Sequence, residues 1–425
     1  MNIPKSNLPR VIIIGGGFAG IALAKKLKNK PIQVVLLDKH NYHTFQPLLY
    51  QVATGGLEAG SIAYPIRKVI HEHKDFYFRL CHVNEIDTKN NKIIADIGEL
   101  SFDYLVIATG SKTNYFGNKE IERNSIAMKT IPQSLNIRSL ILENFEQALL
   151  TNDVAERNAL INFVLVGGGP TGVELAGALA EMKKAILPKD YPDLDVRKME
   201  INLIQGSDRV LDSMSENASA KAEKFLVDLG VEVWKNIRVT DYDGNKVYMK
   251  SGKEIPSNNV IWAAGVTGNV IDGFPSENLV RNRYIVDRFN KVKGYDNIYA
   301  VGDIAYMETP KYPQGHPQVA NVAINQAKNL GKNFLRKNKN EWVEYEYKDQ
   351  GSLATIGKHR AVVDLPFIKF QGFLAWYFWM FLHLMLILSV RNKLAIFFNW
   401  MWSYFNKDSS LRLIISPSQK NNTQQ

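Results

Sequence analysis

The chain has 425 residues, too many for one ordinary domain, so two or three domains are expected. Its net charge of +10 comes from lysines and arginines scattered along the sequence, without an RNA- or DNA-binding motif, so no nucleic-acid partner is expected. Attraction to anionic lipid headgroups explains this charge if a membrane segment exists; a generally basic surface without a partner is the alternative. The single cysteine, Cys81, excludes an internal disulfide, a C-x-x-C redox pair and an all-cysteine metal cluster.

The stretch 11–38 carries the first motif. Gly15, Gly17 and Gly20 have the G-x-G-x-x-G spacing between an apolar strand and a helical pattern, and a second apolar strand ends on Asp38. In this arrangement the glycines permit a tight turn, the approach of the backbone to a pyrophosphate, and close packing of helix on strand. The acid would hydrogen-bond an adenosine ribose. Together these features predict a dinucleotide site.

The next segments are less regular. Residues 41–59 are apolar with interleaved Gln, Tyr and His, and 68–78 and 86–102 read as surface strands. A further apolar strand then ends on Thr109 and Gly110. In a doubly wound fold, strand ends of this kind lie over the cofactor.

After a helix expected at 144–156, the opening pattern returns. Gly167, Gly169 and Gly172 reproduce the glycine spacing, and Gln205 occupies the place of the ribose-binding acid. This internal repeat predicts two dinucleotide sites in one chain.

Three later features complete the pattern. The strand end that contains Gly265 resembles the one at Thr109, and another strand presents Gly302 and Asp303 at its end. A helix rich in amide side chains is expected over 318–333.

Two dinucleotide sites without a phosphate-binding P-loop suggest a flavin enzyme, in which one site holds FAD and the other a nicotinamide dinucleotide that reduces it. Asp303 favours FAD at the first site, because an acid at a late strand end can reach the ribityl-pyrophosphate; a simple turn is the alternative. No His or Cys cluster suggests a metal site.

Glu174 and Gln205 have chemical interpretations of their own. Glu174 is expected in the first turn of the second motif's helix, where a carboxylate either favours the helix dipole or helps to position a hydride or relay a proton. A neutral Gln205 removes the repulsion of a 2′-phosphate, and Arg209 lies nearby in the sequence. We therefore predict NADH as the main donor with NADPH tolerated.

The C-terminal region is aromatic. Residues 370–390 contain no Asp, Glu, Lys or Arg, and a second aromatic run follows Arg391 and Lys393. A spanning helix needs about 20 apolar residues, which the first run just reaches. Dense Trp and Tyr with basic edges favour an amphipathic helix pair in the membrane interface over a spanning helix, a soluble core or a dimer face.

These motifs resemble those of type II NADH dehydrogenases, the non-pumping NADH:quinone oxidoreductases. The resemblance covers about 10–405 and rests on GGGFAG, NYHTFQPLLYQVATGGL, GGGPTGVELAG, WAAGV, AVGDIA and ATIGKHRAVVDL before the Trp-rich end. It implies an α/β fold with two Rossmann-like dinucleotide-binding domains, glutathione-reductase-like but without the redox cysteines, and a C-terminal amphipathic helical membrane anchor.

The resemblance also implies functional residues and partners. FAD contacts would come from the first glycine loop, Asp38, Thr109, Gly110 and Asp303, and nicotinamide contacts from near Gly169, Glu174 and Gly265. A membrane quinone would accept the electrons, at the lipid bilayer surface and usually in a homodimer. With no signal peptide before the first strand, the body is expected on the cytoplasmic face of a bacterial inner membrane.

The amide-rich helix departs from the family pattern. The family's quinone-site helix usually reads A-Q-x-A-x-Q, whereas this chain has Asn321 and Asn325 at the glutamine positions, after Gln318. Asparagine keeps the amide but is one methylene shorter, so the pose or affinity of the quinone is expected to differ. Ordinary surface residues are the alternative for both asparagines.

The expected domains follow from this organisation: 1–120 and 291–365 bind FAD, 121–290 binds NAD(P)H, 366–408 anchors the membrane and 409–425 is a flexible tail. The expected activity is hydride transfer from NADH to FAD and then two-electron reduction of quinone, without proton pumping, because no chain of intramembrane acids is present. A ferredoxin or rubredoxin reductase and an NADH-sensing flavoprotein are the alternatives. Disulfide and sulfide:quinone reductases need more cysteines than Cys81 provides.

Overall fold

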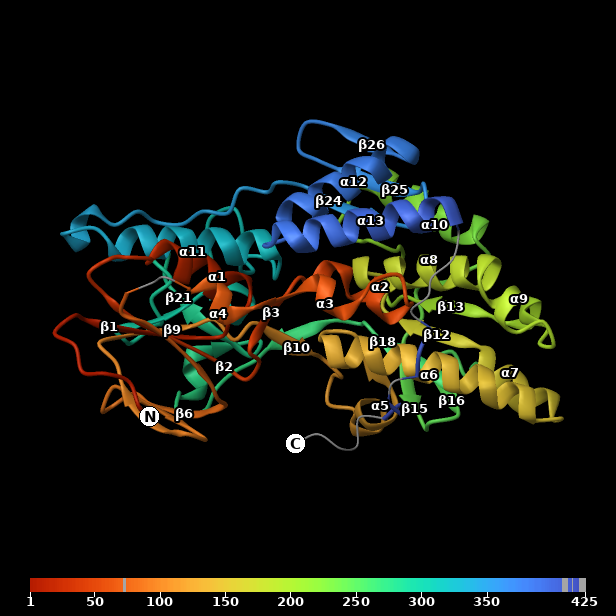
Figure 1. Cartoon of the computed structure of the whole chain (residues 1–425), viewed down its shortest axis with the longest axis horizontal. Helices are drawn as coiled ribbons and strands as arrows, with labels where there is room; N and C mark the ends of the chain where they lie inside the picture. Colours follow the sequence, from red (N-terminus) through yellow and green to blue (C-terminus); the bar gives the residue numbers. More distant parts are fainter. Residues whose placement is uncertain (72–73, 407–411, 415, 420–425) are drawn as a thin grey trace. The chain divides into compact units, whose positions relative to one another are not determined.

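The computed structural model describes residues 1–71, 74–406, 412–414 and 416–419. The chain forms two compact units (Figure 1). Unit 1 comprises Met1–Thr44, Ala63–Lys112 and Val266–Asp349, and unit 2 comprises Phe45–Ile62, Thr113–Gly265 and Gln350–Gln425. Each unit has its own five-stranded parallel sheet, as the internal repeat predicts.

The sheet of unit 1 has the strand order β22-β9-β1-β2-β5. These strands are β22 (Ile298–Ala300), β9 (Tyr104–Ile107), β1 (Arg10–Ile14), β2 (Gln33–Asp38) and β5 (Phe76–Leu80). All the pairings are parallel, and Ile12 lies between Val35 and Leu105 in register. The central strands are buried on both faces, which is why they read as continuous apolar runs.

Helix α1 (Phe18–Lys26) follows β1 and packs against α11 (Ala320–Phe334). Smaller elements complete unit 1: β3 (Tyr42–Thr44), β4 (Ala63–Pro65), α4 (Ile66–Val69), β6 (Val83–Asp87), β7 (Lys92–Ala95), β8 (Gly98–Ser101), β20 (Leu279–Val280), β21 (Arg283–Val286), β23 (Ala305–Met307) and the pair β10 (Ser111–Thr113) and β19 (Val266–Gly268).

The surface strand expected at 68–78 is wrong. Residues 66–69 form α4, 72 and 73 lie outside the described residues, and β5 is the edge strand of the parallel sheet, with Phe78 1% exposed. The short aromatic run FYFRL suits the edge strand of a parallel sheet as well as a surface strand, so the sequence pattern does not distinguish the two.

The sheet of unit 2 has the order β11-β18-β12-β13-β14 and is also parallel. Its strands are β11 (Ile126–Ala127), β18 (Asn259–Trp262), β12 (Phe163–Val166), β13 (Ile201–Ile204) and β14 (Glu232–Trp234). The other elements around it are α2 (Leu49–Ala53), α3 (Ala59–Ile62), α5 (Lys119–Asn124), α6 (Ile131–Leu150), α7 (Val154–Ile161), α8 (Pro170–Ala185), α9 (Leu187–Asp190), α10 (Glu216–Asp228), β15 (Val239–Tyr242), β16 (Lys246–Met249) and β17 (Glu254–Pro256).

The single helix expected at 144–156 is two helices. Helix α6 ends at Leu150 and α7 begins at Val154, because the side chain of Asp153 accepts the amide protons of Ala155 and Glu156 as an N-cap. The chain therefore turns within the predicted segment.

The C-terminal part of unit 2 has a three-stranded antiparallel sheet, β24 (Ser352–Thr355), β25 (Ala361–Asp364) and β26 (Lys369–Gln371), followed by α12 (Phe373–Leu386) and α13 (Val390–Asn406). The two expected helices are thus present, but the break lies at 387–389 and Arg391 and Lys393 belong to α13. Within the described part of the chain, every helix is too short or too polar to span a bilayer.

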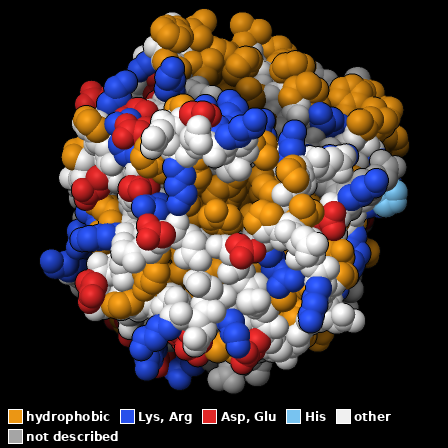
Figure 2. Space-filling view, turned by 90° about the vertical axis from the view of Figure 1, so that its left-hand side faces the viewer, with side chains coloured by type: hydrophobic (Ala, Val, Ile, Leu, Met, Phe, Trp, Pro, Cys, Tyr) orange, Lys and Arg blue, Asp and Glu red, His pale blue; other side chains and the backbone are white. Residues whose placement is uncertain are grey.

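Helix α12 is apolar on both sides. Trp376, Trp379 and His383 are buried at helical spacing, whereas Leu374 and Phe381 on the other side are 72% and 61% exposed. Figure 2 shows basic and acidic side chains mixed over one face of the molecule and hydrophobic side chains gathered along its upper edge. The flexible tail expected at 409–425 lies in large part outside the described residues.

Candidate functional site

The first glycine loop joins β1 to α1 in unit 1. Gly15 has φ +110°, and a Cβ there would overlap the carbonyl oxygen of Ala108; a Cβ on Gly20 would overlap the carbonyl oxygen of Gly15. Gly17, the N-cap of α1, has no neighbouring atom within 4 Å of such a Cβ. The first and third glycines are therefore required by the protein's own packing, whereas the second leaves open space in front of the helix N-terminus.

Asp38 at the end of β2 closes this loop. Its Oδ2 accepts the N–H of Gly16 at 2.5 Å, its Oδ1 accepts the N–H of His40 at 2.7 Å, and burial raises its pKa. His43 was missed at the sequence level: its Nδ1 lies 3.0 Å from the carbonyl oxygen of Gly16, so it donates there. Both the N–H and the carbonyl oxygen of Gly16 are thus hydrogen-bonded to side chains, which fixes the conformation of the loop.

The predicted residues at the end of β9 lie on the same edge of the sheet. The Thr109 hydroxyl donates to the carbonyl oxygen of Asn269 at 2.7 Å, which fixes the turn after the strand. Gly110 has φ +68°, a conformation that L-residues rarely adopt.

Gly302 and Asp303 follow β22, the neighbouring strand. Gly302 has φ +79°, and its N–H donates to Oε1 of Gln326 at 2.8 Å. The hydroxyl of Ser111 donates to Oδ2 of Asp303 at 2.6 Å. Since β22 pairs with β9, and β9 with β1, the structure brings these residues to the carboxyl edge that carries the first glycine loop.

The predicted quinone residues surround the start of α11. Gln318 precedes the helix and donates from Nε2 to the carbonyl oxygen of Asp303 at 2.9 Å. Asn321 and Asn325 lie in its first turns, one turn apart, and both are half-buried. All three amides therefore belong to unit 1, next to the strand end that presents Asp303.

The second glycine loop, between β12 and α8 in unit 2, repeats the geometry of the first. Gly167 has φ +114°, a Cβ there would overlap the carbonyl oxygen of Ala263, and a Cβ on Gly172 would overlap that of Gly167. Gly169, the N-cap of α8, again has no atom within 4 Å of a Cβ. The sequence repeat is thus also a repeat of local conformation.

Gln205 plays the structural part of Asp38 in this second loop. Its Oε1 accepts the N–H of Gly168 at 2.7 Å, and its Nε2 donates to the Ser207 hydroxyl at 2.5 Å. Gly265, after β18, has φ +148°, and a Cβ there would lie 3.7 Å from Phe116. An amide oxygen therefore replaces a carboxylate oxygen without changing how the loop is closed.

Glu174 does not lie in the first turn of α8, as the sequence suggested, because the helix begins at Pro170. Its side chain is 8% exposed, and its Oε1 accepts the N–H of Thr355 in β24 at 3.4 Å. Burial raises the pKa of Glu174 from 4.5 to about 8, opposed by the Thr355 amide and the Trp379 indole. The carboxyl group is therefore neutral through most of the physiological range.

A chain of hydrogen bonds joins α13 to α2 close to this carboxyl group. The Trp400 indole donates to Oε1 of Gln51, and Nε2 of Gln51 donates to the Tyr50 hydroxyl, both at 2.8 Å. Burial raises the pKa of Tyr50 well above its usual value, and Glu174 acts in the same direction. Sequence reasoning missed Tyr50 and Gln51 as contacts, although they lie in the PLLYQVATG block that carries the resemblance.

His383 in α12 belongs to the same buried region. Its Nδ1 lies 2.8 Å from the carbonyl oxygen of Trp379, and its ring stacks on that indole at 4.0 Å. Burial lowers the pKa of His383 to about 4, so the imidazole is neutral at pH 7. Neutral, titratable groups from α8, α2 and α12 therefore line one interior region of unit 2.

In each of the two parallel sheets, one strand leads through the same kind of glycine loop into the N-terminus of a helix. This arrangement defines the class of nucleotide-dependent oxidoreductases with two dinucleotide-binding domains. Residues 9–327 match the family model described as "Pyridine nucleotide-disulphide oxidoreductase", and 350–407 match the "NDH2 C-terminal domain". The second match covers β24 to α13.

Similar proteins of known function identify the family within this class. Two type II NADH:quinone oxidoreductases of Mycobacterium tuberculosis are 35% and 33% identical, over 94% and 93% of this chain and 87% and 88% of theirs. A probable NADH dehydrogenase of Dictyostelium discoideum is 29% identical over 94% of this chain and 91% of its own. The chain belongs to the type II NADH:quinone oxidoreductase family.

Solved structures share the fold. NDH2 from Plasmodium falciparum, solved in complex with NADH, superposes with a TM-score of 0.88 over 96% of this chain and 100% of that chain, at 23% identity. The sulfide:quinone oxidoreductase of Aquifex aeolicus reaches 0.68 over 94% and 96%, at 22% identity. Both likenesses concern the fold alone.

Proposed function

We propose that this chain is a flavoprotein that takes a hydride from NADH and passes two electrons to a membrane quinone. The observation that carries the proposal is the pair of equivalent glycine loops in a member of this family, each with an open second-glycine position at a helix N-terminus. When bound, FAD supplies the chemistry that converts hydride transfer into electron transfer.

FAD fits the first loop. The open space at Gly17 would admit its pyrophosphate to the N-terminal end of α1, where the backbone N–H groups and the helix dipole favour an anion, and a residue with a Cβ at this position would reduce that space. Asp38 would turn a carboxylate oxygen toward the ribose, and Asp303, oriented by Ser111, would reach the ribityl-pyrophosphate end. Thr109 and Gly110 would border the site.

NADH fits the second loop by the same reasoning. Gly169 leaves the open approach to α8, Gly265 borders the neighbouring strand end, and Gln205 would contact the ribose. Because Gln205 is uncharged, it does not repel a 2′-phosphate, which supports NADH as main donor with NADPH tolerated.

Glu174 is proposed as the group that holds a proton during turnover. It is buried, it has a defined hydrogen bond from Thr355, and its pKa of about 8 places its ionisation near the working pH. A neutral carboxylic acid can donate a hydrogen bond that a carboxylate cannot.

The quinone part of the proposal rests on amide side chains in unit 1, and the membrane part rests on exposed apolar side chains in unit 2. Gln318, Asn321 and Asn325 provide amides of the kind expected to bind a quinone carbonyl. The exposed apolar side chains of α12 and α13 support attachment to a bilayer surface, which we place on the cytoplasmic face of a bacterial inner membrane, in a homodimer.

Anaerobic reduction and reoxidation test the function. The protein, extracted from membranes with detergent and loaded with FAD, is reduced with NADH, and a short-chain menaquinone is then added while flavin absorbance is followed. Rapid reoxidation by quinone is expected. A flavin that ignores quinone but reduces a ferredoxin would refute the proposal in favour of a soluble-type reductase.

A further inference from the structure

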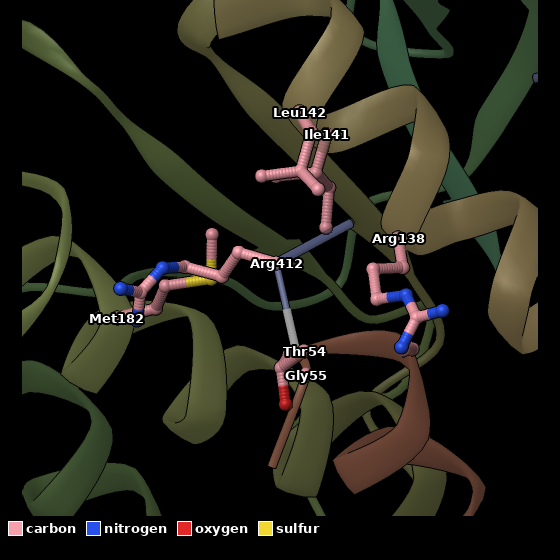
Figure 3. A pocket seen from close by; sticks show the side chains of 8 residues that line it. Thr54, Gly55, Arg138, Ile141, Leu142, Met182 and Arg412 are labelled. Atoms are coloured by element: carbon pink, nitrogen blue, oxygen red, sulfur yellow. The ribbon is translucent and has the colours of Figure 1, made fainter. Parts of the chain in front are cut away.

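A small cavity in unit 2 lies between α2, α6 and α8 (Figure 3). The side chains of Arg138, Ile141, Leu142 and Met182 line it, and its volume is about 10 Å³. This volume has room for about one water molecule, so the cavity is too small for a substrate or a cofactor group. Unit 2 has open space instead at the second glycine loop, where no atom comes within 4 Å of a Cβ on Gly169.

The loop that follows β13 folds back onto this glycine loop. The N–H of Leu211 donates to the carbonyl oxygen of Gly168 at 2.8 Å, and Leu211 is fully buried with φ +49°. The N–H of Asn236, just after β14, donates to the carbonyl oxygen of Ser207 at 2.9 Å. A left-handed conformation is unfavourable for leucine and persists only where the surrounding contacts fix it. The loop therefore has a defined conformation at the edge of the site.

Asp212 follows Leu211 and directs its carboxylate to Gln205. Its Oδ2 accepts hydrogen bonds from the Ser207 hydroxyl at 3.0 Å and from Nε2 of Gln205 at 3.4 Å. The other end of the Gln205 amide, Oε1, is bonded to the N–H of Gly168. A carboxylate therefore lies beside the side chain that would contact the adenosine ribose.

The negative charge of Asp212 is available to a ligand. The side chain is exposed, and both groups that donate to its Oδ2 are uncharged. Arg209, three positions earlier, directs its Nη2 to the backbone carbonyl oxygen of Asp212 at 3.0 Å. A cation of the same loop thus fixes the backbone at Asp212, and a dinucleotide bound at this edge would meet the carboxylate.

The first glycine loop shows what this charge replaces. There Asp38, at the end of β2, carries the carboxylate and accepts the N–H of Gly16 itself. In the second loop these two tasks are divided: Gln205 makes the bond to the glycine loop, and Asp212, seven positions later, carries the charge. We propose that Asp212 is the specificity-determining acid of the second dinucleotide site, which disfavours a 2′-phosphate and makes NADH the preferred donor.

The role of Asp212 rests on the proposed function, in which the second loop binds NADH. A carboxylate at this edge can accept a hydrogen bond from a free 2′-hydroxyl, and it repels a 2′-phosphate. Because Asp212 is exposed, water and salt screen the repulsion, so we expect a preference on the order of tenfold and not complete exclusion. The neutral Gln205 thereby permits NADPH, and Asp212 limits its use.

Binding of adenine nucleotides that cannot reduce the flavin tests the charge. AMP and adenosine 2′,5′-bisphosphate differ only in the 2′-phosphate, and calorimetry on the FAD-loaded protein gives the Kd of each. Asp212→Asn should tighten binding of the bisphosphate on the order of tenfold and change the Kd for AMP by less than about twofold. Added salt should reduce the discrimination between the two nucleotides more in the wild type than in the variant.

Asp228→Asn is a matched control in the same unit. Asp228 is exposed, pairs with Lys224 at 3.8 Å and lies in the last turn of α10, about 18 Å along the axis from the first residue of that helix, Glu216. Its substitution removes one carboxylate at a distance and should leave both Kd values unchanged. Asp212→Glu, which keeps the charge, should keep the wild-type ratio of the two Kd values.

Turnover gives an independent reading. In Asp212→Asn the ratio of kcat/KM for NADPH to that for NADH should rise on the order of tenfold. A purely structural role would instead weaken both nucleotides together and lower the Tm without changing the ratio, and that result would overturn the proposal. Equal affinities of the wild type for AMP and the bisphosphate would also overturn it. A wild-type protein whose flavin is not reduced by NADH would refute the proposed function itself.

Discussion

Replacing Glu174 by Gln removes a buried carboxyl group that titrates and keeps an oxygen that can accept the Thr355 N–H. Burial raises the pKa of Glu174 from 4.5 to about 8, so the folded chain holds this proton at pH values where the unfolded chain releases it. The group's contribution is therefore fully present below pH 4.5 and is lost as the pH rises through 8.

The size of the loss follows from linkage. Between pH 5 and 8 the free energy of unfolding falls by up to about 1.4 kcal/mol per pH unit because of Glu174, or by about 5 kcal/mol over the whole window. This value is an upper limit, because the protein can relax around the charged carboxylate. We expect the free energy of unfolding of wild type to fall relative to that of Glu174→Gln as the pH rises. The difference should become constant above about pH 9.

Thermal and urea unfolding of the FAD-loaded proteins between pH 5 and 9 measure this difference. The rate of flavin reduction by NADH, followed anaerobically, should show an inflection near pH 8 in the wild type that Glu174→Gln lacks. Glu216→Gln, at an exposed position in the same unit, is the control and should leave both profiles unchanged. Parallel stability curves for wild type and Glu174→Gln would refute the burial reasoning, and an inflection that survives would refute the proposed role.

Four further variants test the remaining site residues. Gly169→Ala should leave the Tm unchanged, because the added Cβ meets no protein atom, but it should weaken NADH binding on the order of tenfold, because the Cβ occupies space that the ligand needs. Gly172→Ala should instead lower the Tm, because its Cβ would overlap a backbone oxygen. Gln205→Glu should reduce kcat/KM for NADPH by about tenfold with little change for NADH, because a carboxylate repels the 2′-phosphate. The double change of Asn321 and Asn325 to Gln should lower the KM for a short-chain quinone by restoring the longer amides.

Each of these has a clear contrary result. Unchanged NADH affinity in Gly169→Ala, measured by titration of the FAD-loaded protein, would remove the second loop from the dinucleotide site. Equal NADPH turnover before and after Gln205→Glu would contradict its contact with the ribose. A KM for quinone that does not move with the amide length would place the asparagines outside the quinone site.

Local chemistry made the glycine loops predictable. The turn, the open helix N-terminus and the helix–strand contact all arise within the short stretch from Gly15 to Asp38, so spacing alone encodes them. The same holds for the second loop, where Gln205 could be placed because it follows its own strand. The domain and cofactor assignments of these loops stay predictions.

Elements whose type depends on neighbours were less predictable. The segment at β5 is a short aromatic run, and its place at the edge of a parallel sheet depends on pairing with β2. The break between α6 and α7 depends on one cap at Asp153, a signal that the sequence contains but that the apolar periodicity on both sides conceals.

The sequence by itself determined the α/β fold with two parallel sheets, the family and the aromatic C-terminal helices, because glycine spacing and hydrophobic periodicity are short-range properties of the chain. Only the tertiary structure decided the environments of single side chains. Glu174 is buried against Thr355, which is 181 positions further along the chain, and Arg138 looks in the sequence like any solvated helix residue but lines a cavity. Protonation depends on desolvation, and desolvation is set by the segments that pack together in space.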